Sequence, residues 1–215
     1  MDDALGHANV ETAIIDRLDV GSRRIAQVEA PVLAAANLGA DGMLGVDSLR
    51  NQRAVMDFDG RKFLVGRSAE EVDDFTSSTT IVLGRKPFRQ LILVDAESQT
   101  VPIFVILDSG AQSTVGNIAL QRLMTFSPPN TGRLPFNTFI SVTGSRMQVE
   151  VDRVPEIQLG GITIRNVPIA YARLHTFTHF GVDDKPAILL GTNVLHLFHS
   201  VAVDFRRGEA SFVAD

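Results

Sequence analysis

Residues 101–111, which read VPIFVILDSGA, join an apolar stretch to an acidic turn. The stretch from Val101 to Leu107 is rich in β-branched side chains and therefore predicts a buried strand. Asp108-Ser109-Gly110 follows at once, so a carboxylate lies at the end of this strand, where the chain must turn. An Asx-turn that simply ends the strand would explain the triplet as well as a functional acid would.

The composition of the whole chain favours strands over long helices. The 215 residues are 45% hydrophobic, and the 13 Phe and the short runs of Val, Ile and Leu lie between Gly and Pro residues. Such spacing is typical of an all-β fold. The formal net charge is −5 and no long basic run occurs. We therefore expect neither nucleic acid nor a membrane surface as a partner, but a peptide or a small molecule.

Cysteine content and targeting signals exclude a few chemistries but do not locate the protein. The chain has no Cys, which excludes a thiol nucleophile, a thiolate metal site and disulfides. The acidic start and the short apolar runs predict no signal peptide and no transmembrane segment. These features leave the compartment open.

The chain contains two similar segments, residues 10–65 and residues 149–213. Both predict a strand ending at Leu-Gly, a short helical turn and a closing hairpin with a glycine in its turn. We therefore predict an internal duplication. At an offset of 139 the matches are Val10-Glu11 with Val149-Glu150 and Ile25–Val28 with Ile164–Val167; after a loop that is longer in the second copy they are Met43-Leu44-Gly45 with Leu189-Leu190-Gly191, Asp57-Phe58 with Asp204-Phe205, and Gly60 with Gly208.

The second copy has a front part, residues 90–144, whose counterpart is missing from the first copy. A counterpart of Asp108 would fall upstream of Met1, so the first copy supplies no second acid of this kind. Asp57 and Asp204 occupy equivalent positions and are expected to be structural acids that close each copy. We expect a partial first lobe at residues 1–66, a polar linker at 67–80 and a complete second lobe at 81–215.

Two motifs of the second lobe resemble those of the retropepsin-like and pepsin-like aspartic peptidases. These are Ile106-Leu107-Asp108-Ser109-Gly110-Ala111 and, later, Ile188-Leu189-Leu190-Gly191. In that family an apolar-apolar-Asp-Ser/Thr-Gly-Ala loop is crossed from behind by an apolar-apolar-Gly motif. The resemblance covers the second lobe and implies acid-protease β-barrel lobes with short helices.

The resemblance also implies roles for individual residues. Asp108 would be the water-activating carboxylate, and Ser109 the hydroxyl that braces the loop against a partner lobe. Gly110 would let the backbone approach the catalytic water, and Ala111 would complete the loop. The remaining residues are the loop-backing motif Leu189, Leu190 and Gly191 and the flap candidates Thr143, Gly144 and Ser145.

In this family two carboxylates share one proton and activate a water molecule, without a cofactor. The resemblance therefore implies an aspartic endopeptidase in which Asp108 is half of a catalytic dyad. The other acid would come from a segment outside this sequence, which the duplication favours, or from a second copy in a homodimer. The alternative function is a catalytically inactive peptide-binding module with the same fold.

A metal site is the remaining alternative. His175 and His179 are four residues apart and Asp183-Asp184 follows, which would suit a metal if residues 173–180 were helical. Alternating Thr and Phe and the lack of a zinc-peptidase Glu favour a loop instead. The sequence therefore predicts no metal.

Overall fold

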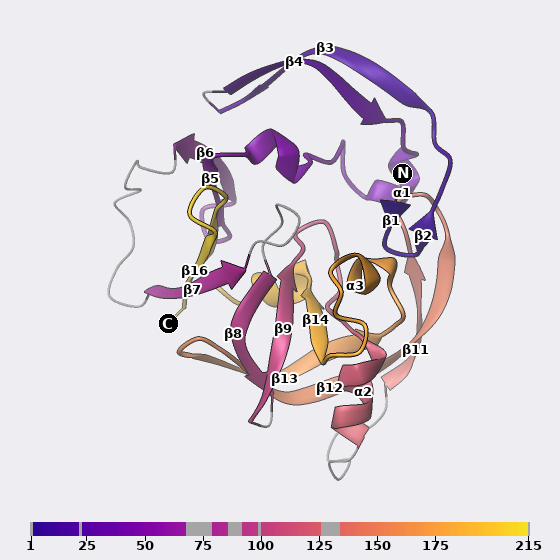
Figure 1. Ribbon diagram of the computed structural model, residues 1–215, viewed down its shortest axis with the longest axis vertical. Helices are drawn as coiled ribbons and strands as arrows, with labels where there is room; N and C mark the ends of the chain where they lie inside the picture. Colours follow the sequence, from indigo (N-terminus) through magenta and orange to yellow (C-terminus); the bar gives the residue numbers. More distant parts are fainter. Residues whose placement is uncertain are drawn as a thin grey trace.

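The computed structural model describes residues 2–21, 23–67, 79–85, 92–98, 100–125 and 134–214 (Figure 1). Strands dominate and the helices are short, which confirms the predicted all-β class. Among the described residues no helix is both long and apolar enough to cross a membrane.

The bounds of the elements are as follows. The strands are β1 (Asp2–Asp3), β2 (Gly6–His7), β3 (Thr12–Val20), β4 (Arg23–Pro31), β5 (Gln52–Asp57), β6 (Lys62–Arg67), β7 (Thr79–Arg85), β8 (Ile92–Ser98), β9 (Val101–Leu107), β10 (Val115–Gly116), β11 (Leu134–Ile140), β12 (Arg146–Leu159), β13 (Ile162–Tyr171), β14 (Ala187–Leu190), β15 (Ser200–Asp204) and β16 (Glu209–Val213). The helices are α1 (Ala35–Leu38), the 3-10 helix η1 (Val46–Leu49), α2 (Ile118–Thr125), α3 (His175–His179) and α4 (Thr192–Leu195).

Six strands of the second half form a closed ring in the order β8, β9, β14, β10, β13 and β12. The ring closes because β12 pairs with β13 along its length and also with β8 at Gln158 and Leu159. Ile103, Leu120 and Ile157 are almost fully buried in the core of this ring. Closure leaves the ring without free edges, which is how small β-barrels protect their backbone hydrogen bonds.

A second group of paired strands, β7, β16, β15, β5 and β6, joins the two halves of the chain. Val55 of β5 pairs directly with Ala202 of β15. The predicted alignment matches Asp57 with Asp204, and therefore also matches Val55 with Ala202. Antiparallel pairing of equivalent residues is the arrangement that a local twofold axis produces.

The two equivalent acids of these strands hold their hairpin turns. The Asp57 carboxylate accepts a hydrogen bond from the Gly60 N–H at 2.7 Å. Asp204, which is buried, accepts from the N–H groups of Arg206 and Arg207 at 3.0 and 2.8 Å. Both acids therefore have the structural contacts expected of them. The predicted glycine conformation is found only at Gly208 (φ 74°), because Arg61 (φ 51°) takes the left-handed position in the first hairpin.

The hairpins β3–β4 and β12–β13 have the same register. Val20 pairs with Arg23 and Leu159 with Ile162, which are equivalent pairs at the offset of 139. The turns contain Gly21 (φ 57°) and Gly160 (φ 58°). The pairing of each hairpin is also interrupted at a non-glycine residue of positive φ. This residue is Gln27 (φ 51°) in β3–β4 and the equivalent Asn166 (φ 58°) in β12–β13.

The surroundings of the two hairpins differ. Among the described residues, β3 and β4 pair only with each other, and Figure 1 shows them as an arch at the top. The predicted strand at Met43-Leu44 is wrong, since these residues lie outside any strand and are 55% and 40% exposed. Its equivalent β14 is held by β9 and β10, which have no described counterpart in the first half.

The predicted linker lies largely outside the described residues. Residues 68–78 are not described, Arg67 ends β6, and Thr79 and Thr80 begin β7. The boundary between lobes therefore stays a prediction.

Candidate active site

Asp108 is the first residue after β9, and the backbone of its turn is firmly held. Its N–H donates to the carbonyl oxygen of Leu190 at 3.1 Å, which extends the parallel pairing of β9 with β14 by one residue. Its carboxylate Oδ1 accepts from the Gly110 N–H at 2.9 Å. The Ala111 N–H donates to the Asp108 carbonyl oxygen at 3.2 Å. The side chain is thus fixed at the end of a core strand while the turn that follows reaches the surface.

The electrostatic environment of Asp108 favours its protonated form. Burial raises the pKa of its carboxyl above the ordinary value, and the N–H groups of Gly110 and Ala111 oppose this rise only in part. Removing a carboxylate from water disfavours its charge. An acid of this kind can keep its proton at a pH where an exposed Asp has lost it.

The predicted loop-backing motif lies directly behind this turn. Leu189 and Leu190 of β14 are almost completely buried, at 2% and 1% exposure. Gly191 comes so close to the loop that an added Cβ would lie 2.6 Å from the carbonyl carbon and oxygen of Ser113. No side chain fits at position 191 without a backbone shift. The next N–H, that of Thr192, donates to the Ala111 carbonyl oxygen at 2.8 Å.

A polar pair, the buried Thr114 and the exposed Asn193, fastens the Asp108 loop to this motif. Thr114 is 0% exposed, and its Oγ1 donates to Asn193 Oδ1 at 2.8 Å. The same hydroxyl accepts from the Gly191 N–H at 3.1 Å. Asn193 Oδ1 also accepts from the Thr114 N–H at 2.8 Å. Sequence reasoning missed this pair, although a Thr between turn and strand and an Asn two residues after the Gly were its visible signals.

Thr114→Val should therefore destabilise the chain. The substitution keeps the shape of the side chain but leaves the buried Gly191 N–H without its acceptor, and a loss of this kind costs about 1–3 kcal/mol. Thr138→Val is the matched control, because Thr138 is exposed and accepts only from Gln148 Nε2. The free energy of unfolding in urea checks both variants. Equal stability of the two would show that the Thr114–Asn193 pair does not fasten the loop.

The other predicted loop residues lie on the outer side of the turn. Ser109 and Gly110 are exposed, and Ala111 is partly buried. Met43 of the first half approaches this turn, since a Cβ added at Gly110 would lie 3.3 Å from Met43 Cε. The outer face of the Asp108 turn therefore meets the first half of the chain.

The flap candidates Thr143, Gly144 and Ser145 lie in the turn between β11 and β12. The Gly144 N–H donates to the Ser141 carbonyl oxygen at 2.9 Å, and the Ser145 N–H to Ser141 Oγ at 3.2 Å. A Cβ added at Gly144 would lie 2.9 Å from Nδ2 of Asn37. The segment around Asn37 and Met43 thus reaches both this turn and the Asp108 loop.

A cavity of about 190 Å³ lies between the β11–β12 hairpin and the chain that follows the Asp108 turn. Its lining includes Ser113 and Asn193 on the polar side and Phe139, Val149 and Val151 on the apolar side. The cavity therefore borders the loop, its fastening pair and the strands of the flap candidate.

Residues 175–179 of the stretch 173–180 are helical, so the loop predicted there is wrong. His175–His179 form α3 because Phe177 (1% exposed) is buried in the core below it. Asp183 accepts from Thr178 Oγ1 at 2.7 Å. Within the described ranges no group of three or more His, Cys, Asp or Glu residues is placed to hold a metal ion.

Comparison with known proteins agrees with this geometry. Residues 94–194 match the family model described as aspartyl protease. A solved retropepsin-like aspartic protease from Rickettsia conorii is 15% identical, with a TM-score of 0.44 over 65% of this chain and 96% of that chain. No curated protein matches the chain. The region that holds Asp108 and the 189–191 motif therefore belongs to the aspartyl protease family, which confirms the family predicted from the sequence.

Proposed function

We propose that this protein is an aspartic endopeptidase and that Asp108 is one half of its catalytic dyad. The observation that carries the proposal is the partly buried Asp108 carboxyl, whose raised pKa and fixed turn suit an acid that keeps or gives up a proton during the reaction. Aspartic catalysis needs a pair of carboxylates that share one proton and hold the attacking water between them. Asp108 would be one of these two groups.

The neighbouring residues support this role. Gly110 donates its N–H to the carboxylate, and Leu190 accepts the Asp108 N–H, so the acid cannot swing away from its position. Gly191 allows β14 to lie close behind the loop. We assign Thr143–Ser145 as the flap, because this turn ends the long β11–β12 hairpin next to the cavity beside the loop. An extended peptide would lie between the flap and Asp108.

The chain is further proposed to be an internal duplication with a single acid of this kind. The support is the shared register of β3–β4 and β12–β13 and the direct pairing of the equivalent residues Val55 and Ala202. Asp57 in the first half holds its own turn, and Asp59 pairs with His199 at 2.6 Å. Neither precedes a Ser/Thr-Gly pair. The second carboxylate would therefore come from a second copy of the chain or from a segment outside residues 1–215.

A peptide library incubated from acid to neutral pH, with and without pepstatin, tests the proposed function. We expect pepstatin-sensitive cleavage in acid that is lost as the pH rises through the raised pKa of Asp108, because two ionised carboxylates cannot share a proton. Any cleavage by the chain alone should increase with the square of its concentration if two copies form the dyad. Absence of cleavage at every pH and concentration would contradict the proposal and favour a peptide-binding module, provided that it persists when a segment with a second Asp-Ser/Thr-Gly turn is supplied.

A further inference from the structure

The β3–β4 hairpin carries an apolar face that the described structure leaves open. Ile15 is 39% exposed, whereas its equivalent in the second half, Val154, is 0% exposed. The same contrast holds along the hairpin. This open face consists of Ile15, Ile25, Val28 and Ala30, all exposed or partly exposed, whose equivalents at the offset of 139 are Val154, Ile164, Val167 and Ile169, at 0, 7, 1 and 1% exposure.

The second half shows what covers such a face. Val154 and its neighbours share one core cluster with Ala96 of β8, Ile103 of β9 and Leu120 of α2. Strand β8 also pairs with β12 at Gln158 and Leu159. In the part of the chain that the structure describes, no strand takes these places beside β3 and β4. The open face thus lacks the strands that its equivalent packs against.

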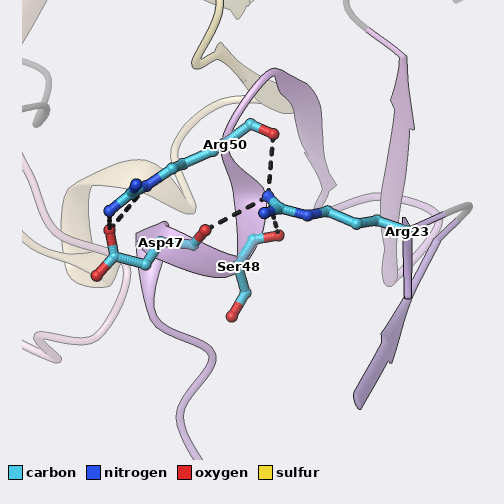
Figure 2. Close-up of polar contacts among 4 residues, drawn as sticks. All are labelled: Arg23, Asp47, Ser48 and Arg50. Carbon is cyan, nitrogen blue, oxygen red and sulfur yellow. Dashed lines mark hydrogen bonds and ion pairs between the residues drawn. The ribbon is translucent and has the colours of Figure 1, made fainter. Parts of the chain in front are cut away.

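The hairpin is nevertheless fixed at its turn, so its open face has a defined direction. Val20 is 7% exposed and packs with Leu49 and Ala54. Arg23 donates from Nη1 to three backbone carbonyl oxygens at and after η1, those of Asp47, Ser48 and Arg50, at 3.4, 3.4 and 3.2 Å (Figure 2). An isolated two-stranded hairpin is only marginally stable, and these contacts hold one end of it in place.

A second copy of this chain is not suited to cover the open face. Its β8 and β9 are already enclosed in its own ring, with β9 between β8 and β14. The place beside β15, where a symmetric partner strand would pair, is taken by β5 of the same chain. A second copy would have to unfold its ring to offer these strands.

We propose that the open face is the docking surface for a polypeptide segment outside residues 1–215 that repeats the strand pattern of residues 79–139. Its first apolar strands would pack on Ile15 and its partner Val28, and the strand equivalent to β8 would pair with β3 at Asp19 and Val20. This segment would also carry the second Asp-Ser/Thr-Gly turn, a part of the inference that rests on the proposed function. Docking itself depends only on the geometry of the hairpin.

One departure limits how closely the docked segment can copy the second half. Ala170 donates its N–H to the Thr114 carbonyl oxygen at 3.0 Å. Its equivalent, Pro31, has no N–H to donate. The strand equivalent to β10 should therefore pair with β4 less completely, and docking should rest mainly on β3 and the apolar contacts.

The test joins a second copy of residues 79–139 ahead of Met1 of the full chain, which continues the offset of 139 without a gap. Covalent joining gives the segment a high effective concentration. Hydrogen exchange then reports on the amides of residues 12–31. We expect the amides of this hairpin that form no hydrogen bond between β3 and β4 to exchange at least about tenfold more slowly in the fused chain than in the unfused chain. Equal exchange in both chains would overturn the proposal.

Two variants of the fused chain make the result specific. Ile15 and Ile14 are 39% and 59% exposed, so we expect the unfused chain to fold with an Asp at either position. Successive residues of a strand point to opposite faces. Ile15→Asp should therefore abolish the added protection, and Ile14→Asp should leave it unchanged. Equal effects of the two variants would overturn docking on this face.

A peptidase assay on the same proteins separates this inference from the proposed function. Protection of residues 12–31 with pepstatin-sensitive cleavage supports both. Protection without cleavage supports the docking surface and counts against the peptidase. Cleavage by the unfused chain that rises with the square of its concentration would overturn the assignment of the second acid to the docked segment, because a second copy would then supply it, whereas docking itself is decided by the exchange of residues 12–31.

Discussion

Asp108→Asn is expected to lower pepstatin-sensitive peptide cleavage by about two to four orders of magnitude, the range that a positioned acid or base contributes. Asn has nearly the same shape and keeps an oxygen that can accept the Gly110 N–H, so the turn should be unchanged. It cannot take up or release the shared proton. The assay compares the parent protein with Asp108→Asn under conditions in which the second carboxylate of the dyad is also present.

Asp183→Asn is the matched control, because Asp183 is exposed and accepts only a local hydrogen bond from Thr178. It should cleave at the unsubstituted rate. Cleavage by Asp108→Asn at that same rate would show that Asp108 has no part in the chemistry, whatever the family of the region.

Asp108→Asn should also stabilise the folded chain at neutral pH, and the sign of this effect follows from the raised pKa of Asp108. Below the ordinary Asp value of 3.8 the carboxyl is protonated in both the folded and the unfolded chain. As the pH rises through the raised folded pKa, ionisation in the partly buried site costs stability. Asn avoids this cost. The free energy of unfolding of Asp108→Asn should exceed that of the parent at neutral pH, and the difference should vanish in acid.

The sequence was sufficient to predict features that depend on local pattern. The apolar run before Asp108 predicted β9, and the match of Asp57 with Asp204 predicted two equivalent turn-holding acids. The proposed duplication also implies repeated backbone geometry. The left-handed residues Gln27 and Asn166 share this geometry although neither is a glycine.

Features that depend on tertiary partners could not be predicted in this way. Met43-Leu44 has the pattern of β14 but forms no strand, since a strand needs a neighbour for its hydrogen bonds. The Thr and Phe alternation at residues 173–180 suggested a loop, yet burial of Phe177 favours a helix. The Thr114–Asn193 pair joins residues 79 positions apart, so the local signal at each residue does not reveal that the two are partners.

Gly191→Ala is expected to lower the free energy of unfolding by about 3 kcal/mol or more, at the upper end of overpacking effects. The added Cβ would lie 2.6 Å from backbone atoms of Ser113 and 3.0 Å from the Ala111 carbonyl oxygen. These are backbone atoms of the Asp108 loop, so no side chain can rotate away to relieve the contact. Either β14 or the loop must shift.

Gly161→Ala is the control, because its added Cβ would lie at an ordinary 3.8 Å from Thr80 Oγ1 and the φ of Gly161 is not positive. Both changes restrict the unfolded chain equally, so the difference in unfolding free energy between them isolates the contact behind the loop. A shift of about 1 Å in a catalytic group costs on the order of 100-fold in rate, and Gly191→Ala should lose cleavage at least to that extent even where it remains folded. If Gly191→Ala matched Gly161→Ala in both stability and cleavage, the 189–191 motif would not position Asp108.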